Sequence, residues 1–202
     1  MARPLLAAAL VGGSAACASL PSRPPPEAAE RVRRAGSYSA SLRVTLKGPE
    51  LRGRTSALVA FRRPDRLRIE VPGPSGARLI AVSEGGRLAA VFPGDRAFFE
   101  GSAGPADLEA LLGIALAPSE VIDLLVGAPS ARLREYRAGW KNGLPRRVHA
   151  VLPDGAKLDV TVLEADLDPP LPDAAFAVPA HAGYRRVQAD EARTLWEQGS
   201  RR

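Results

Sequence analysis

The chain has 202 residues, of which 46% are hydrophobic and 25% are charged, and its formal net charge is +6. This length and composition predict one folded domain with a substantial core and exclude a wholly disordered chain. Two histidines and a single cysteine exclude Cys/His zinc modules, iron–sulfur clusters and an intramolecular disulfide framework.

The N-terminal residues have the pattern of a secretory signal peptide. Arg3 gives a positive start, Leu5–Val11 is an apolar run too short to span a bilayer, and small residues follow up to Cys17. A single cysteine in this place is similar to a bacterial lipobox, whose thiol takes a diacylglycerol. Ser14 stands where that pattern usually has leucine, so ordinary cleavage that leaves a free thiol is the alternative. We expect residues 1–16 to be a signal peptide and Cys17 to be acylated.

A Pro-rich segment separates this leader from the folded part of the chain. Residues 17–26 are interpreted as the acylated cysteine and a semi-rigid tether that holds the domain near a membrane. We expect the domain itself to cover residues 27–187, with residues 188–202 as a C-terminal helix or tail. A first short helix is predicted over Pro26–Arg34, because acidic residues come early and basic residues late in it.

Alternation of apolar and polar residues then predicts a series of strands. Leu42, Val44 and Leu46 share one face of the first strand, with polar residues between them. Glycine-rich turns at Gly73–Gly76 and Glu84–Gly86 separate neighbouring strands. The strands expected in this half of the chain are 39–47, 54–62, 66–71, 78–83, 87–92 and 96–100.

The apolar spacing becomes helical in the middle of the chain and then returns to alternation. Helices are predicted over 105–112 and 118–126, each followed by glycine. The later elements expected are strands at 131–137, 146–152, 157–163 and 176–178 and a helix at 189–198. An antiparallel sheet this long must curl or close. The predicted fold class is therefore α+β: a strongly curved antiparallel sheet, or half-open β-barrel, of about nine to eleven strands with short helices covering the opening.

The apolar inner faces of such a sheet would form either a cavity or a filled core, and periodicity does not decide between them. The candidate lining residues for a cavity that holds acyl chains are Leu42, Val44, Leu46, Val59, Phe61, Leu67, Ile69, Ile80, Val82 and Phe92 from the strands, with Leu112, Ile122 and Leu125 from the helices.

Catalytic patterns are not found in the sequence, and the arginine clusters that nucleic-acid binding would use lie on alternate strand positions, where a solvated face needs polar residues. His149 is expected in a solvent-facing strand position and His181 in a loop, and two isolated histidines do not make a metal site. Nucleophile-elbow, phosphate-loop and metalloprotease motifs are missing. We therefore expect a protein that is not an enzyme, uses no cofactor and does not bind nucleic acid. The arginines would instead attract anionic lipid headgroups.

Four segments together resemble the LolA/LolB superfamily, whose members carry and receive lipoproteins on the way to the outer membrane. Leu67–Leu79 resembles the strand–turn–strand region around the "(G/N)-P-L-G" turn of LolB-type receptors, and Gly113–Pro129 resembles their helical "G-x-x-L/I-P…L…W-x-x-G-x-P" stretch. Gly143–Val148 is similar to the late "P-x-x-I" strand, and Phe176–Pro179 is similar to the end of carrier-type members. The resemblance covers most of residues 27–187 and is closest to the LolB-type receptor.

This resemblance implies a monomeric outer-membrane lipoprotein at the periplasmic face, which binds acyl chains of lipoproteins or lipids and has a periplasmic LolA-type carrier as a possible partner. It implies a membrane-insertion turn at Pro74, Ser75 and Gly76. Ser75 replaces the exposed leucine of the receptors, and Leu124 and Leu125 stand where they have tryptophan. The alternative is an envelope assembly or sensing lipoprotein that has the same fold and does not transport.

Overall fold

The computed structural model describes residues 24, 26–48 and 52–200. The proposed signal peptide, Cys17 and most of the tether lie outside the described residues.

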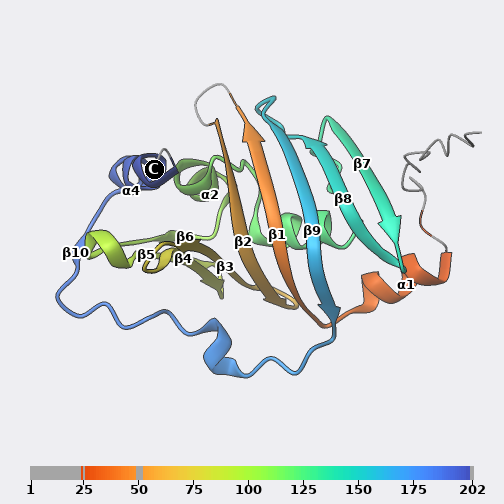
Figure 1. The fold of residues 1–202 in the computed structure, drawn as a ribbon, viewed down its shortest axis with the longest axis horizontal. Coiled ribbons are helices and arrows are strands. Elements are labelled where there is room, and N and C mark those ends of the chain that lie inside the picture. The colour runs from red at the N-terminus through yellow and green to blue at the C-terminus, as the bar shows by residue number, and fades with distance from the viewer. Residues whose placement is uncertain (1–23, 25, 49–51, 201–202) are drawn as a thin grey trace, which may run out of the picture.

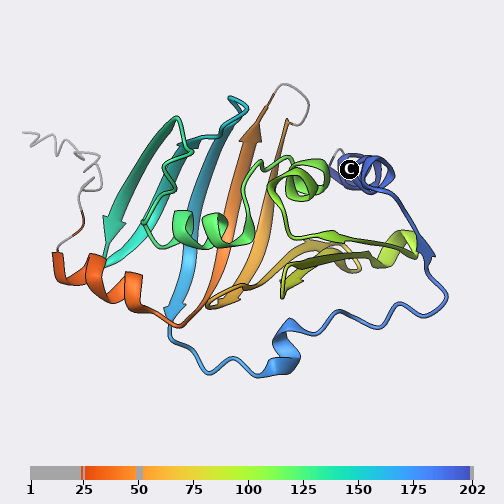
Figure 2. The ribbon, with the colours of Figure 1, turned by 180° about the vertical axis from the view of Figure 1, so that it is seen from behind.

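One curved sheet of ten strands forms the body of the molecule (Figures 1 and 2). Its strands, in spatial order, are β10 (Arg185–Arg186), β6 (Ala97–Ser102), β5 (Arg87–Phe92), β4 (Gly76–Glu84), β3 (Arg66–Gly73), β2 (Arg52–Arg62), β1 (Ser37–Lys47), β9 (Lys157–Leu167), β8 (Leu144–Val151) and β7 (Glu135–Lys141). Neighbouring strands are antiparallel except that β10 runs parallel to β6. The predicted fold class is therefore confirmed.

Helices cover the concave face and the ends of this sheet. They are α1 (Pro26–Arg34), α2 (Pro105–Leu112), α3 (Pro118–Leu125) and α4 (Ala189–Ser200), with the short 3-10 turns η1 (Pro93–Asp95) and η2 (Asp173–Phe176). Figure 1 looks onto the convex face with α2 and α3 behind the sheet, and Figure 2 shows the same two helices in front of it. Helix α4 packs beside α2, and its Trp196 belongs to the main hydrophobic core.

The sheet divides between β2 and β3. These strands pair from Leu58 opposite Glu70 to Arg62 opposite Arg66, and the pairing stops there. Residues 52–57 of β2 pair with β1 on one side but have no ladder partner in β3 on the other. Helix α4 contacts β2, and its Leu195 lies near the β3–β4 turn. The helix therefore stands at the place where the two strands diverge.

Tight turns at glycine set the register of the hairpins. Gly85 and Gly86 both have positive φ, as do Asn142 and Gly143 in the β7–β8 turn. Two central residues with positive φ make the two-residue turn whose twist suits a β-hairpin. The sequence predicted the turn at Glu84–Gly86, because glycine adopts this backbone conformation without steric cost.

Two predicted strands differ from those observed. The strand expected at 131–137 begins at Glu135 and continues to Lys141, because the N–H of Leu133 bonds the carbonyl of Ser130 in a turn. The strand expected at 176–178 is wrong. Phe176 ends the 3-10 turn η2, and the following residues pair with no strand.

A segment after β9, residues 168–178, crosses the convex face and is called the strap below. The carboxylate of Asp168 accepts bonds from the N–H groups of Gly36, at 2.7 Å, and Ser37. Farther on, Arg62 and Arg66 each contact Asp173 at 2.6 Å. These hydrogen bonds lower the pKa of Asp173 below its usual range. The two arginines thus fasten the strap to strands β2 and β3.

Phe176 of the strap is buried against Ile80 and Val82 on the convex side of β4. These two residues were expected to line an inner cavity, and that prediction is wrong. Pairing of Ile69 with Ala81 turns Leu79 and Ala81 inward and Ile80 and Val82 outward. The convex face therefore has a small apolar cluster of its own, and the strap shields it from water.

We predict that Phe176→Ala lowers the free energy of unfolding by about 3 kcal/mol, because it removes a buried aromatic ring from a small cluster. Urea unfolding followed by circular dichroism measures the change. Val178→Ala is the control, since that side chain is 40% exposed and its loss should change stability by less than about 0.5 kcal/mol. Equal effects of the two substitutions would show that the strap does not stabilise the fold.

Candidate functional site

The concave face contains an apolar cavity of about 90 Å³ between the sheet and the helices. Its walls come from β1, β2, β3 and β9, from α2 and α3 with the residue Ile114 between them, and from α4. The lining residues are Leu42, Val44, Leu46, Gly53, Arg54, Thr55, Ala57, Val59, Ile69, Val71, Leu112, Ile114, Val121, Leu124, Leu125, Leu158, Val160 and Trp196.

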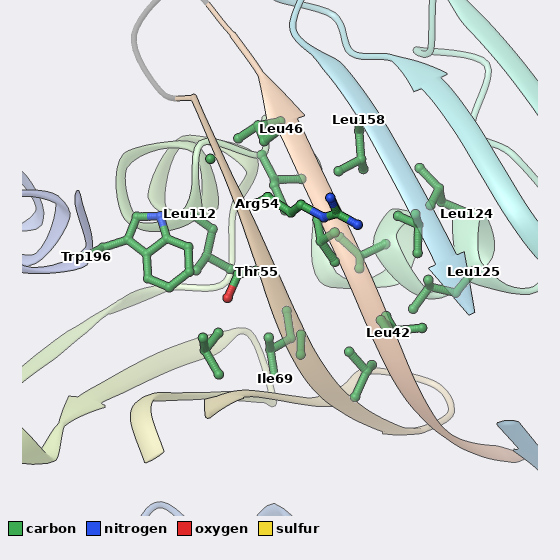
Figure 3. Close-up of a pocket in the computed structure, with 18 residues that line it drawn as sticks. Leu42, Leu46, Arg54, Thr55, Ile69, Leu112, Leu124, Leu125, Leu158 and Trp196 are labelled. Atoms are coloured by element: carbon green, nitrogen blue, oxygen red, sulfur yellow. The ribbon is translucent and has the colours of Figure 1, made fainter. Parts of the chain in front are cut away.

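The cavity reaches the surface beside the unpaired part of β2. Gly53 and Arg54 are the exposed members of the lining, Thr55 is half-buried, and Trp196 opposite them is 8% exposed. Figure 3 shows the Trp196 ring next to Leu112 and Thr55, on one side of the cavity. Arg54, Thr55 and Trp196 are the lining residues whose side chains carry polar atoms. The mouth is therefore polar and the interior is aliphatic.

Helix α3 is held in place by a carboxylate at its start. Glu120 accepts a hydrogen bond from the N–H of Ala117 at 2.8 Å and one from the Ser130 hydroxyl at 2.6 Å, and it pairs with Arg132 at 3.0 Å. Burial alone would raise the pKa of Glu120, but these three partners outweigh it and lower the pKa. A negative charge also suits the positive end of the helix dipole. The cap directs Val121 into the cavity.

Contacts with the sheet fix the other end of α3. The guanidinium of Arg63 pairs with Asp123 at 3.1 Å, and the hydroxyl of Tyr136 donates to the carbonyl of Leu124 at 3.2 Å. Burial raises the pKa of the Tyr136 hydroxyl, so the group stays a proton donor over the physiological range. These bonds hold Leu124 and Leu125 against the cavity.

Helix α4 closes the mouth from the other side of the divided sheet. The guanidinium of Arg78 lies 4.7 Å from the centre of the Trp196 ring, a cation–π geometry. Ala192, one turn earlier, is fully buried, and Arg193 pairs with Glu197 at 3.1 Å along the helix. One ring from a C-terminal helix thus covers the side of the cavity that no strand closes.

The sequence-predicted lining residues fall into three groups. Seven line the cavity: Leu42, Val44, Leu46, Val59, Ile69, Leu112 and Leu125. Four are buried in the adjoining core without reaching the cavity: Phe61, Leu67, Phe92 and Ile122. Ile80 and Val82 are on the opposite face, under the strap. Phe61 is instead stacked on Tyr38, with ring centres 5.2 Å apart.

The turn Pro74, Ser75 and Gly76 is exposed at the end of the β3–β4 hairpin. Leu195 and Gln198 of α4 lie beside it. The turn therefore neighbours the helix that covers the cavity mouth. Its Ser75 gives the turn a polar tip.

Sequence reasoning missed several residues of the site. Val121 and Leu124 had a usable signal, since Val121 precedes Leu124 by three residues and Leu125 by four, the spacings that share one helical face. Thr55 also had one, since it alternates along β2 with Ala57 and Val59. Arg54 and Trp196 had none, because their roles depend on where β2 and β3 part and where α4 docks.

The two histidines do not form a metal site. His149 is half-buried, not fully solvent-facing as expected, and its Nδ1 lies 2.7 Å from Asp159 on the neighbouring strand. His181 Nδ1 lies 2.9 Å from the carbonyl of Pro179. Over the described residues, no group of three or more His, Cys, Asp or Glu could hold a metal ion. None of the helices in that part of the chain is long and apolar enough to cross a membrane.

Comparison with known proteins yields weak structural likeness only. No family model matches the sequence, and no curated protein matches it. An uncharacterized conserved protein from Thermus thermophilus is similar with a TM-score of 0.44 and 13% identity, over 80% of this chain and 96% of that one. A LolA superfamily protein from Nitrosomonas europaea is similar with a TM-score of 0.43 and 11% identity, over 75% of this chain and 95% of that one. A putative outer membrane lipoprotein-sorting protein domain from Vibrio parahaemolyticus is similar with a TM-score of 0.40 and 9% identity, over 74% of this chain and 94% of that one. These scores establish neither a family nor a function.

We predict that Glu120→Gln lowers the free energy of unfolding at pH 7 by about 1 kcal/mol, since charge-assisted hydrogen bonds become neutral ones. The pKa of Glu120 is lower in the folded chain than in the unfolded one, so its contribution is present above the unfolded pKa of about 4.3 and is lost as the pH falls through the folded pKa. Urea unfolding from pH 7 to pH 3 should show the two proteins converging at low pH. A constant difference would mean that the ionised carboxylate is not what holds α3.

Proposed function

We propose that this chain binds acyl chains of lipids or lipoproteins in the concave cavity and takes part in lipoprotein localisation. In this proposal it works as a monomer at the periplasmic face of the outer membrane, where acylated Cys17 anchors it. The supporting observation is the composition of the cavity, whose interior is built from Leu, Val, Ile and Ala side chains. The sequence resemblance to the LolB-type receptors suggests the same kind of ligand and a LolA-type carrier as donor.

The chemistry of these walls suits reversible binding of an alkyl chain. Each methylene moved from water to an apolar site contributes about 0.8 kcal/mol, and the walls offer no group that would bond covalently with the chain. Transfer between a donor and an acceptor then needs only a small difference in affinity. A protein that binds acyl chains transiently and then releases them needs this kind of site.

The present cavity is smaller than a full acyl ligand requires. Pockets for small molecules usually measure about 300–1,000 Å³, against about 90 Å³ here. Binding of a whole chain therefore requires some lining element to move outward. Helix α4 is the natural choice, because it lies at the end of the chain and closes the unpaired side of β2 with Trp196.

A second candidate is an envelope assembly or sensing lipoprotein that does not transport. The small cavity favours it, and so does Ser75, which gives the β3–β4 turn a polar tip where a membrane-inserting leucine is expected. The two candidates differ in whether acyl ligand occupies the protein. Mass spectrometry of lipids and lipoproteins that co-purify with the chain distinguishes them.

We predict that Val44→Phe reduces co-purifying or added acyl ligand at least several-fold, because a ring at this half-buried lining position fills the cavity. Binding of a fluorescent fatty acid to the purified chain measures the effect. Leu163→Phe is the matched control, since Leu163 is 43% exposed and does not line the cavity. Both variants keep the same N-terminal segment, so any binding there is common to them.

Equal ligand binding by Val44→Phe and Leu163→Phe would place the ligand outside the cavity. If the wild-type chain is empty on purification and takes up no added acyl ligand, the acyl-binding proposal fails and only the non-transporting candidate remains.

We predict that Cys17→Ser abolishes incorporation of labelled palmitate and removes the protein from the outer-membrane fraction, because the thiol is the proposed acylation site. Metabolic labelling and membrane fractionation test this. Persistence of the label in the variant would overturn the proposed anchor without affecting the proposal for the cavity.

A further inference from the structure

Cationic side chains gather at the end of the sheet where the cavity opens. Lys47 of β1 pairs directly with Arg52 of β2 and with Lys157 of β9. These three side chains are exposed and form one row across three neighbouring strands. Arg54 is two residues after Arg52 on the same face of β2, about 7 Å from this row by strand geometry. We call Lys47, Arg52, Arg54 and Lys157 the basic rim.

The basic rim adjoins the apolar cavity. Arg54 is itself one of the two exposed lining residues, and Leu46, next to Lys47 in sequence, lines the interior at the same end of β1. Figure 3 places Arg54 between Thr55 and Leu46 at this end of the cavity. A chain that enters at the unpaired edge of β2, beside Gly53 and Thr55, therefore leaves its polar end next to Arg54, from which the rest of the rim continues along the convex side of this end of the sheet.

The charges of the rim are not neutralised in the sheet. Several other strand arginines do have a carboxylate partner, as Arg68 has Glu70 at 2.9 Å and Arg62 has Asp173 at 2.6 Å. Among the described residues, no carboxylate forms an ion pair with any member of the rim. The nearest acid in the ladder, Asp159, bonds His149 instead.

Like charges directly opposite one another weaken a sheet. A row made only of cations is therefore a cost to stability, which a solvated face of mixed charge would avoid. An anion held at the rim would relieve this repulsion.

We infer that the cavity binds a single-chain amphiphile with an anionic headgroup, a carboxylate or a phosphate, whose chain lies in the cavity and whose head lies at the basic rim. This inference rests on the proposed function and narrows its ligand from acyl chains in general to those with a negative head. An acylated N-terminal cysteine, whose thioether and amide are neutral, makes no use of the rim.

The experiment compares probes that share one saturated chain and differ in the head. Myristate and tetradecyl phosphate are the anionic probes, tetradecanol is the neutral one, and inorganic phosphate carries the anion without a chain. Brominated versions of the chain probes should quench the fluorescence of Trp196, which lines the cavity, and Trp196→Phe identifies that part of the signal.

The variant Arg54→Gln should weaken myristate and tetradecyl phosphate about 5- to 10-fold and leave tetradecanol unchanged. Added salt should weaken only the anionic probes. Arg147→Gln is the matched control. It removes one positive charge from an exposed position on β8 that does not line the cavity.

Equal binding of all three chain probes, or equal losses in Arg54→Gln and Arg147→Gln, would overturn the headgroup assignment and leave the acyl-binding proposal intact. Failure of every chain probe to quench Trp196 would refute the acyl-binding proposal itself. Binding of inorganic phosphate as tight as that of tetradecyl phosphate would show that the rim is a site for the free anion. Tighter binding of tetradecyl phosphate than of inorganic phosphate supports a site for an anionic amphiphile.

Discussion

The divergence of β2 from β3 is the constraint on which the rest of the structure depends. Ladder pairing ends at Leu58 opposite Glu70, so the first half of β2 has one strand neighbour only. A curved sheet with an apolar concave face cannot leave such a gap open to water. Helix α4 covers it with Trp196, which explains why a C-terminal helix belongs to the main core. The opening, the cavity and Arg54 lie along this one irregularity, and the other cations of the rim continue from there across β1 and β9.

The cavity is retained at a cost. At about 24 cal/mol per Å³, a void of about 90 Å³ corresponds to about 2 kcal/mol of stability that a filled core would have. Some of the surrounding side chains are small enough for a larger apolar residue to fill the space, as at Ala57. The same energy favours any ligand that occupies the void, and the ligand must also displace α4 for a full chain to fit. The affinity is the difference between these two terms, which keeps binding reversible.

Much of the fold could be predicted from the sequence because local rules decide it. Clean alternation in β1 identified Leu42, Val44 and Leu46 as inward-facing, and glycine pairs located the hairpin turns. Prediction failed where local rules are silent. The apolar run Leu79–Val82 has no alternation, so its orientation depends on the register with β3. The mouth, with Arg54 and Trp196, depends on long-range docking that no local pattern encodes.

The interior of the cavity and the basic rim act on different parts of a ligand. The interior offers only dispersion and burial, which depend on chain length and are indifferent to the headgroup. The rim offers only charge, which acts on the headgroup and is screened by salt. Because the two contributions come from different residues, affinity and selectivity can be altered separately. Helix α4 adds a third control, since Trp196 must move outward before a whole ligand can contact both the interior and the rim. A site of this kind holds an amphiphile firmly enough to shield its chain from water and weakly enough to give it up.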